Sequence, residues 1–242
     1  METTVQKVII VGATSGIGRR LAELYAEKGY QVGITGRRNE LLEEIKKQLP
    51  GKIETECFDV TGNENIPRIN SLVSKMGGLD ILIYSSGIGE PSKQLDWQLD
   101  KLTVDTNVNG FVEISNWGFN YFVNQGYGHL VTISSVASHR GNSWAPAYSA
   151  SKAFQSNYFE ALAIKAYRMK KNIGITCIEP GFVATKMAKG NKIFMSMSVD
   201  KACKRIITAI EKKKRNSYLS RRWWLVAKLV KHLPYAIMKK II

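Results

Sequence analysis

The sequence predicts a single α/β domain with a doubly wound parallel sheet of about seven strands and helices on both faces. Three observations predict this fold class. Short runs of β-branched residues alternate with amphipathic segments of helical length along most of the chain. Two of these runs, around Ile9 and Leu82, are almost continuously apolar, as expected of parallel strands that are buried on both faces. The length of 242 residues also suits one domain of this class.

The strands follow from the apolar runs, and the helices follow from the periodic segments between them. Strands are predicted at 5–11, 31–35, 52–58, 79–85, 128–134, 174–178 and, from a weaker pattern, 217–220. Helices are predicted at 17–28, 39–49, 63–76, 98–125, 147–171 and 199–214. Right-handed crossovers between successive parallel strands would place these helices on both faces of one sheet.

Charge divides the chain into two parts. Residues 201–242 hold 13 Lys or Arg and the single acid Glu211, so they carry +12 of the total net charge of +15. We therefore expect one domain over 1–220, followed by a basic amphipathic helical tail over 221–242. The tail needs an explanation of its own, because a soluble α/β fold does not require such a charge.

The remaining composition favours a cytoplasmic protein without a metal. No run of about 18 apolar residues predicts a membrane-spanning helix, and the pattern of a signal peptide is missing before the first strand. Cys57, Cys177 and Cys203 lack a paired spacing, which favours reduced thiols. The three histidines form no metal-ligand pattern, so no metal site is predicted.

The first predicted strand leads into a glycine-rich turn that reads Gly12-Ala13-Thr14-Ser15-Gly16-Ile17-Gly18. Glycine lets the chain turn tightly and lets its backbone approach a pyrophosphate without a Cβ in the way. The following helix presents unpaired N–H groups and the positive end of its dipole to the phosphates. With a strand before it and a helix after it, the turn predicts a Rossmann-type dinucleotide site rather than a purely structural turn.

The second strand ends in Gly36-Arg37-Arg38, which bears on the choice of dinucleotide. An acid here would bind the ribose 2′-hydroxyl of NAD, whereas arginines suit the 2′-phosphate of NADP. We expect NADP(H) as the cofactor; the alternative is that Arg37 and Arg38 are solvated charges at a helix start. Asp59, followed by Val60 after the third strand, is either a contact for the adenine amino group or an ordinary turn residue.

Ser135, Tyr148 and Lys152 form the pattern Ser-x12-Tyr-x3-Lys. Tyr148 and Lys152 are four residues apart and share one face of a predicted helix, whereas Ser135 ends the preceding strand. A free phenol has a pKa of about 10, too high for efficient proton transfer near neutral pH. A lysine ammonium at about 4 Å favours phenolate by up to roughly 4 kcal/mol. We therefore expect Lys152 to lower the pKa of Tyr148.

Five motifs in this order resemble the short-chain dehydrogenase/reductase family over about residues 5–188. They are the glycine turn, Asn107 in Asp105-Thr106-Asn107-Val108-Asn109-Gly110, Ile133-Ser134-Ser135, Tyr148-Ser149-Ala150-Ser151-Lys152, and Pro180-Gly181-Phe182-Val183-Ala184-Thr185. The resemblance implies an oxidoreductase that transfers a hydride between a nicotinamide and a carbonyl or secondary alcohol.

The resemblance also implies a role for each matched residue. Tyr148 would donate or accept the proton, Ser135 would hold the substrate oxygen, and Lys152 would hydrogen-bond the nicotinamide ribose. Asn107 would bend its helix and hold a water that connects Lys152 to solvent. The resemblance also implies cofactor contacts at Gly12, Thr14, Ser15, Gly16, Ile17, Gly18, Ser86, Gly87, Pro180, Gly181, Val183 and Thr185. Of these, Val183 and Thr185 would contact the nicotinamide carboxamide.

One stretch departs from the family pattern. After the fourth strand the family usually has Asn-Asn-Ala-Gly, whereas this chain has Tyr84-Ser85-Ser86-Gly87. We expect cofactor binding to survive the change, because backbone supplies much of the contact made by that loop in the family. The change leaves open how the centre of the sheet is stabilised.

Two segments bear on the substrate and on the location of the protein. Residues 186–197, the substrate lid in this family, are rich in methionine and fit either an apolar substrate or a lid that packs on its own protein. Trp144 and Phe182 are further candidates for the pocket. The tail has apolar residues at steps of three and four beside lysines, Trp223 and Trp224, as is typical of a helix on an anionic membrane. The alternative is a helix docked on the body or on a second subunit.

We therefore expect an NADP(H)-dependent enzyme that reduces an apolar or lipid-like ketone, such as a 3-keto lipid or a steroid-like compound. The alternative function is a membrane- or partner-binding scaffold that keeps the fold without turnover. Family members commonly pair through the helices corresponding to 98–125 and 147–171, so a homodimer or homotetramer is expected. No recognition motif for nucleic acid accompanies the basic charge, so no such partner is predicted.

Overall fold

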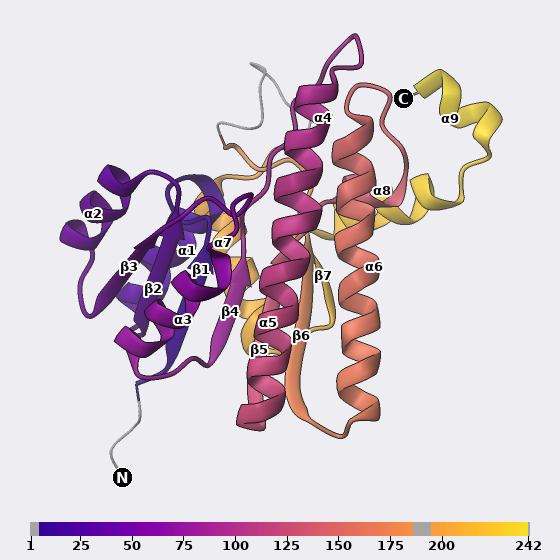
Figure 1. The fold of residues 1–242 in the computed structure, drawn as a ribbon. Coiled ribbons are helices and arrows are strands. Elements are labelled where there is room, and N and C mark those ends of the chain that lie inside the picture. Colours follow the sequence, from indigo (N-terminus) through magenta and orange to yellow (C-terminus); the bar gives the residue numbers. More distant parts are fainter. Residues whose placement is uncertain (1–4, 186–194, 242) are drawn as a thin grey trace.

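The fold is one seven-stranded parallel sheet with helices on both faces, which confirms the predicted fold class (Figure 1). The computed structural model describes residues 5–185 and 195–241. The strands are β1 (Lys7–Val11), β2 (Gln31–Gly36), β3 (Ile53–Cys57), β4 (Ile81–Tyr84), β5 (Tyr127–Ile133), β6 (Asn172–Glu179) and β7 (Asn216–Tyr218). Their order across the sheet is β3-β2-β1-β4-β5-β6-β7.

Helices fill the connections between the strands, and two more follow the last strand. They are α1 (Gly16–Glu27), α2 (Asn39–Gln48), α3 (Asn65–Met76), α4 (Trp97–Val104), α5 (Gly110–Gln125), α6 (Pro146–Arg168), α7 (Val199–Glu211), α8 (Arg221–His232) and α9 (Tyr235–Ile241). Two short segments complete the set: the π-helical turn η1 (Asp105–Asn109) and the 3-10 helix η2 (Val136–His139).

Alternate residues of the central strands point to opposite faces and build two separate cores. On β1, Val8 and Ile10 pack with α1, α2 and α7, whereas Ile9 and Val11 pack with α3, α5 and α6. All four side chains are fully buried. Burial on both faces explains why the sequence of this strand is almost continuously apolar.

The chain changes direction across the sheet at β1. It runs from β1 to β2 and β3 on one side, and it then crosses to β4 on the other side of β1. In open α/β sheets such a switch point leaves a crevice outside the carboxyl ends of the strands, where ligands bind. The glycine turn follows β1 directly and therefore lies at this point.

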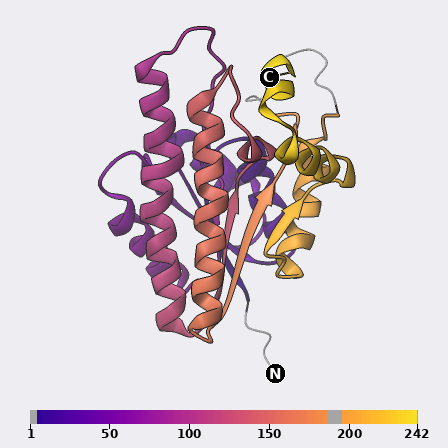
Figure 2. The ribbon, with the colours of Figure 1, turned by 90° about the vertical axis from the view of Figure 1, so that its right-hand side faces the viewer.

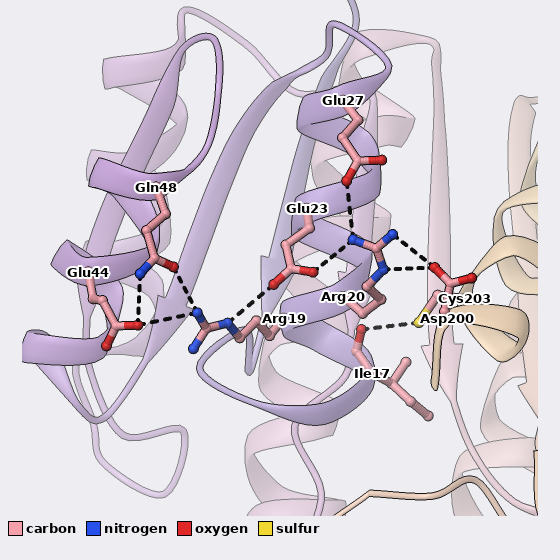
Figure 3. Close-up of polar contacts among 9 residues, drawn as sticks. All are labelled: Ile17, Arg19, Arg20, Glu23, Glu27, Glu44, Gln48, Asp200 and Cys203. Atoms are coloured by element: carbon pink, nitrogen blue, oxygen red, sulfur yellow. Dashed lines mark hydrogen bonds and ion pairs between the residues drawn. The ribbon is translucent and has the colours of Figure 1, made fainter. Parts of the chain in front are cut away.

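Polar contacts fix helix α1, which begins at the glycine turn, to its two neighbouring helices (Figure 3). Arg19 donates to Glu44 and Gln48 of α2 at 3.3 and 2.9 Å. Arg20 donates two hydrogen bonds to Asp200 of α7, at 3.0 and 2.8 Å. Partly exposed ion pairs contribute little stability singly. Together, these contacts define how α1 sits on the sheet and therefore where its first turn points.

The predicted helix over 98–125 is interrupted in the structure. It consists of α4, the π-helical turn η1 and α5, and Asn107 lies within the π-turn. Such turns are rare and are frequently found at functional sites. Figure 2 shows this composite helix and α6 side by side on one face of the sheet.

The tail folds back against the body of the protein. Helix α8 packs on η2 and β7, and its residues Trp223 and Ala227 are buried, as is Met238 of α9. Part of the apolar face predicted for the tail is therefore covered by the protein itself. No helix among residues 5–185 and 195–241 is long and apolar enough to span a membrane.

Candidate active site

The glycine turn has the backbone that a phosphate site requires. Gly12 and Gly16 have φ angles of 87° and 58°, which side-chain-bearing residues rarely adopt. A Cβ on Gly18 would lie 2.1 Å from the carbonyl oxygen of Gly12, so the close turn requires glycine there as well. Ser15 makes no side-chain cap at the start of α1, while Ile17 packs against the core. The first N–H groups of α1 therefore lack a side-chain cap and can bind a phosphate.

The end of β2 lies directly against this turn. Arg38 Nη2 donates to Thr14 Oγ1 at 2.6 Å. A Cβ on Gly36 would lie 2.6 Å from Thr14 Cγ2, which is closer than real Cβ contacts. A side chain at this position, where an NAD-type acid would stand, would therefore require Thr14 to shift.

Asp59 and Arg37 lie together at the ends of β3 and β2. Arg37 Nη1 is 3.7 Å from Asp59 Oδ2. The other carboxylate oxygen of Asp59 accepts hydrogen bonds from the backbone N–H and the hydroxyl of Thr61, both at 3.0 Å. Val60 is buried, and a Cβ on Gly110 would lie 2.2 Å from its carbonyl oxygen. Asp59 thus caps a turn and pairs with Arg37, and both of its predicted roles stay open.

Ser135, Tyr148 and Lys152 meet beyond the carboxyl end of β5. Ser135 follows β5, and its Oγ accepts a hydrogen bond from the N–H of Ala137 at 3.1 Å. Tyr148 and Lys152 both project from the first turns of α6, with Lys152 Nζ 5.8 Å from the centroid of the Tyr148 ring. The phenol of Tyr148 interacts with the Ser135 hydroxyl. The predicted set is therefore assembled in space.

Tyr148 is held as a protonated phenol. Burial raises the pKa of Tyr148 above its ordinary value, and the hydrogen bond with Ser135 opposes this rise. Contrary to the expectation from Lys152, the pKa of Tyr148 is therefore raised, and burial is the largest cause. The loop after β4 covers the ring: a Cβ on Gly89 would lie 2.2 Å from Tyr148 Cδ2.

The ammonium of Lys152 is enclosed by the protein. It donates to the carbonyl oxygen of Ile133 at 2.9 Å and to Gln155 Oε1 at 3.0 Å. Burial lowers the pKa of Lys152 to about 8, so the group is mostly charged at neutral pH. A Cβ on Gly87 would lie 3.2 Å from Lys152 Nζ, which places the ammonium beside the loop after β4.

Asn107 holds that loop with both ends of its amide. Its Oδ1 accepts from the N–H of Ile88 at 2.9 Å, and its Nδ2 donates to the carbonyl of Ile88 at 2.7 Å and to Ser151 Oγ at 3.0 Å. The main-chain carbonyl of Asn107 accepts from Gln155 Nε2 at 2.9 Å. The amide of Gln155 therefore connects the main chain at Asn107 to Lys152. The water that the resemblance implies between Lys152 and solvent stays a prediction.

Tyr84, which stands where the family usually has asparagine, ties the end of β4 to the same π-turn. Its hydroxyl donates to the carbonyl of Thr106 at 2.6 Å, and its buried ring meets Phe111 edge-on at 5.4 Å. Ser86 lies against the glycine turn, since a Cβ on Gly12 would be 2.5 Å from Ser86 Oγ. The altered stretch thus keeps its close approach to the turn and anchors β4 with a different side chain.

The loop after β6 lies beside the glycine turn and the segment after Ser135. The carbonyl of Pro180 accepts from the N–H of Val136 at 2.9 Å, which joins this loop to the segment after Ser135. Val183 is buried. Thr185 lies above the glycine turn, because a Cβ on Gly16 would be 3.5 Å from Thr185 Cγ2.

Helix α8 of the tail packs directly on this loop. A Cβ on Gly181 would lie 2.2 Å from the indole of Trp223, and Phe182 meets the same indole edge-on at 5.5 Å. Trp223 Nε1 donates to the carbonyl of Met195 at 3.3 Å. Arg140, between Ser135 and Tyr148 in the chain, donates to three carbonyls at the end of α8, at 3.0, 2.7 and 2.8 Å: Val230, Lys231 and Leu233.

Most of the predicted substrate lid, residues 186–194, lies outside the described residues. Of the two further pocket candidates, Trp144 is 53% exposed and Phe182 is 48% exposed. The carbonyl of Trp144 accepts from the N–H of Ser92 at 2.8 Å, which joins the loop after β4 to the segment before α6. Within the described part of the chain, no three His, Cys, Asp or Glu side chains gather as a metal site would.

A family model described as short chain dehydrogenase matches residues 6–194 of this chain. The chain belongs to the short-chain dehydrogenase family. An uncharacterized oxidoreductase from Mycobacterium tuberculosis is 33% identical to this short-chain dehydrogenase over 240 residues, which are 94% of this chain and 92% of the relative. The chain is therefore an oxidoreductase of this family, whose fold binds nicotinamide cofactors.

Solved structures of low sequence identity share the fold of this short-chain dehydrogenase. A 3-ketoacyl-(acyl-carrier-protein) reductase from Brucella melitensis, complexed with NADH, superposes with a TM-score of 0.78 at 20% identity, covering 88% of this chain and 94% of the reductase. ElxO with NADP bound superposes with a TM-score of 0.81 at 20% identity, covering 92% of this chain and all of that one (100%). At this identity the likeness concerns the fold alone.

Three residues of the site were missed by sequence reasoning. Tyr84 was visible only as a departure from the family pattern, and Gly89 only as a glycine in a loop. Gln155 had a usable signal: it is a polar residue one helical turn after Lys152, on the face that α6 must bury.

Proposed function

We propose that this chain is an NADP(H)-dependent reductase that converts an apolar ketone to a secondary alcohol. The observation that carries the proposal is the convergence of Ser135, Tyr148 and Lys152 beside the crevice that the glycine turn borders. A protein that only bound a dinucleotide would need the turn but would not need these three side chains together.

The reduced nicotinamide, when bound, supplies the hydride for the carbonyl carbon. Tyr148 donates its proton to the carbonyl oxygen, and the Ser135 hydroxyl hydrogen-bonds the same oxygen and stabilises its developing charge. Lys152 would donate a hydrogen bond to the nicotinamide ribose. The backbone of Val183 and the side chain of Thr185 would hold the carboxamide.

Reduction of a carbonyl needs a proton from Tyr148. A phenol carries its proton at neutral pH, and burial raises the pKa of Tyr148 further. The group is therefore present in the form that donates, whereas oxidation of an alcohol needs the phenolate.

Three features at the end of β2 support NADP(H) over NAD(H). The chain has Gly36 in place of the acid that would bind a ribose 2′-hydroxyl, and a side chain there would press on Thr14. Arg38 is held over the glycine turn by Thr14, and Arg37 lies beside Asp59 at the same edge. Two guanidinium groups at this edge suit the 2′-phosphate.

An apolar substrate is supported by the side chains around the crevice. Trp144 and Phe182 are each about half exposed on segments that flank Tyr148 and Pro180. Half-exposed aromatic side chains near a catalytic group are suited to cover an apolar chain or ring. A 3-keto lipid or a steroid-like ketone has this character.

The test is a spectrophotometric assay of NADPH oxidation with a panel of ketones that includes a medium-chain 3-keto ester, a steroid ketone and a small cyclic ketone. We expect turnover of at least one apolar member and a preference for NADPH over NADH. Tyr148→Phe is the matched control, because it keeps the ring and removes the proton. Binding of NADPH without turnover of any ketone would instead favour the scaffold function.

We also propose that the protein forms a homodimer or homotetramer through the composite helix α4-η1-α5 and through α6. On α6, Phe154, Ile164 and Tyr167 are 40%, 50% and 85% exposed, which is unusual for large apolar residues on one helix. Light scattering after size-exclusion chromatography tests this: a monomer at micromolar concentration contradicts it.

We propose that the protein is cytoplasmic and binds peripherally to an anionic membrane. The outer face of α8 supports this location. Trp224, Leu225 and Leu229 are 44%, 59% and 64% exposed beside Arg221, Arg222, Lys228 and Lys231. Mixed aromatic, apolar and basic residues on one helix face suit an anionic lipid surface. Sedimentation with phosphatidylserine vesicles, but not with phosphatidylcholine vesicles, is expected. Replacing Trp224, Leu225 and Leu229 by serine should abolish it, and equal sedimentation of that variant contradicts the proposal.

A further inference from the structure

Gln155 lies at the centre of the buried polar cluster behind the candidate active site. Its side chain has no exposed surface. It projects from α6 one turn after Lys152, on the same face of the helix. Both ends of its amide are engaged, with Lys152 Nζ at 3.0 Å and with the carbonyl oxygen of Asn107 at 2.9 Å.

The chemistry of the two partners leaves only one orientation for this amide. A lysine ammonium has three donors and no acceptor, and a main-chain carbonyl is only an acceptor. Oε1 must therefore face Lys152, and Nε2 must face Asn107. An amide is the neutral group of this size that can accept from one partner and donate to the other.

The bridge also determines where the ammonium of Lys152 can point. One of its N–H bonds is directed to the carbonyl of Ile133 and a second to Gln155. The third remains for a group on the side of the crevice, where the loop carrying Gly87 passes. The two acceptors together leave the cation both oriented and partly compensated for its burial.

Few other ionisable groups influence this ammonium. From β6, the thiol of Cys177 faces the cluster, and burial raises the pKa of this thiol to about 12, so it is neutral. From α6, Tyr148 lies on the crevice side and is a neutral phenol at pH 7. The two dipoles that Gln155 and Ile133 direct at Lys152 are therefore direct contacts that favour its charged form.

We propose that Gln155 is a positioning residue for the reaction: its amide holds the Lys152 ammonium charged and directed at the nicotinamide ribose, and couples it to the π-turn at Asn107. The expected effect on ketone reduction rests on the proposed function. The contact itself exists in the protein without cofactor or substrate, so it can be tested separately.

The test compares Gln155→Met and Gln155→Glu with the wild type. Methionine has similar volume but offers the ammonium no comparable acceptor, so the pKa of Lys152 should fall by about one unit. Glutamate places a carboxylate against the ammonium, so the pKa of Lys152 should rise by a similar amount. The two variants therefore shift the same titration in opposite directions.

The first readout is the free energy of unfolding in urea between pH 6 and pH 10, without cofactor. For Gln155→Met the stability loss should be largest at pH 6, where Lys152 is charged, and should shrink as pH rises past its pKa. For Gln155→Glu the loss should grow as pH rises, because the carboxylate loses its partner. Gln125→Met is the matched control: this amide bridges the carbonyls of Leu79 and Tyr127 with no ionisable partner, so its loss should not follow pH.

The second readout is the pH profile of NADPH-dependent reduction with a ketone that the wild type accepts. The upper limb of the profile should move by about one pH unit toward acid in Gln155→Met and toward alkali in Gln155→Glu. Stability losses in both variants that do not depend on pH overturn the proposal, and they reduce Gln155 to a packing residue. If the wild type reduces no ketone, the proposed function fails, whereas the unfolding measurement still decides the role of Gln155.

Discussion

Removal of the Trp223 indole should loosen the loop after β6 around Gly181, although the residue belongs to the basic tail. Trp223 is 8% exposed and packs against Gly181 and Phe182. Its neighbour Trp224 is 44% exposed. The pair therefore offers two substitutions of the same type, Trp223→Ala and Trp224→Ala, of which only the first empties a packed site.

The magnitude follows from the burial. Truncation of a buried tryptophan to alanine typically costs about 3–5 kcal/mol. Helix α8 buries little else than Trp223 and Ala227, so much of this loss should fall on its docking. If about 1.4 kcal/mol of this stability loss falls on the NADPH-binding conformation of the loop around Gly181, the Kd for NADPH rises about tenfold. A chain cut after Ser220 should lose NADPH affinity at least as much.

The assay is a titration of NADPH fluorescence, combined with limited trypsin digestion of the arginine- and lysine-rich tail. Trp223→Ala should bind NADPH about tenfold more weakly and lose its tail sooner than the wild type. Trp224→Ala should match the wild type in both measurements. Equal NADPH affinity in the two variants and in the chain cut after Ser220 would refute the reasoning. The tail would then be a separate segment that does not influence the loop around Gly181.

Three further outcomes are expected. Tyr148→Phe should lower kcat by orders of magnitude with an unchanged Kd for NADPH, because it removes only the proton; wild-type turnover would contradict the proposed chemistry. Arg37→Asp should raise KM for NADPH at least tenfold more than KM for NADH, since a charge-assisted contact is worth about 1.5–3 kcal/mol; equal changes would mean that Arg37 is merely solvated. Reduction should decline as pH rises through about 8, where Lys152 loses its proton. Deprotonation of Lys152 cannot cause this decline by unfolding the protein. The pKa of Lys152 in the folded protein is about 8, below its ordinary value of 10.5, so its contribution to stability increases between pH 8 and pH 10.5. Circular dichroism over the same range checks that the fold persists.

The fold could be predicted because its signals are local. Continuous apolar runs such as that around Ile9 exist only where both faces of a strand are covered, and the turn at Gly12 requires glycine for steric reasons alone. The convergence of Ser135, Tyr148 and Lys152 was predictable because two of the three share a helix face. These features depend on residues that are near one another in sequence.

The parts that sequence did not reveal depend on distant segments. The raised pKa of Tyr148 results from burial beneath the loop at Gly89, which no spacing in the chain encodes. The docking of α8 depends on Arg140, some ninety residues earlier, which binds the carbonyls at the end of this helix. Periodicity predicted an apolar face for the tail, but it could not say what covers Trp223.

The contact between Gly36 and Thr14 has a consequence for redesign of the cofactor preference. Introducing Asp at position 36 alone would force its Cβ against the Thr14 methyl group, so the Thr14 side chain would have to shift. Thr14→Ala removes that methyl group and leaves the nearest Thr14 atom, Cβ, at 3.7 Å, an ordinary contact. The same change deprives Arg38 of its hydroxyl partner. The proposed preference for NADP(H) is therefore tested better by the double variant Thr14→Ala/Gly36→Asp than by Gly36→Asp alone.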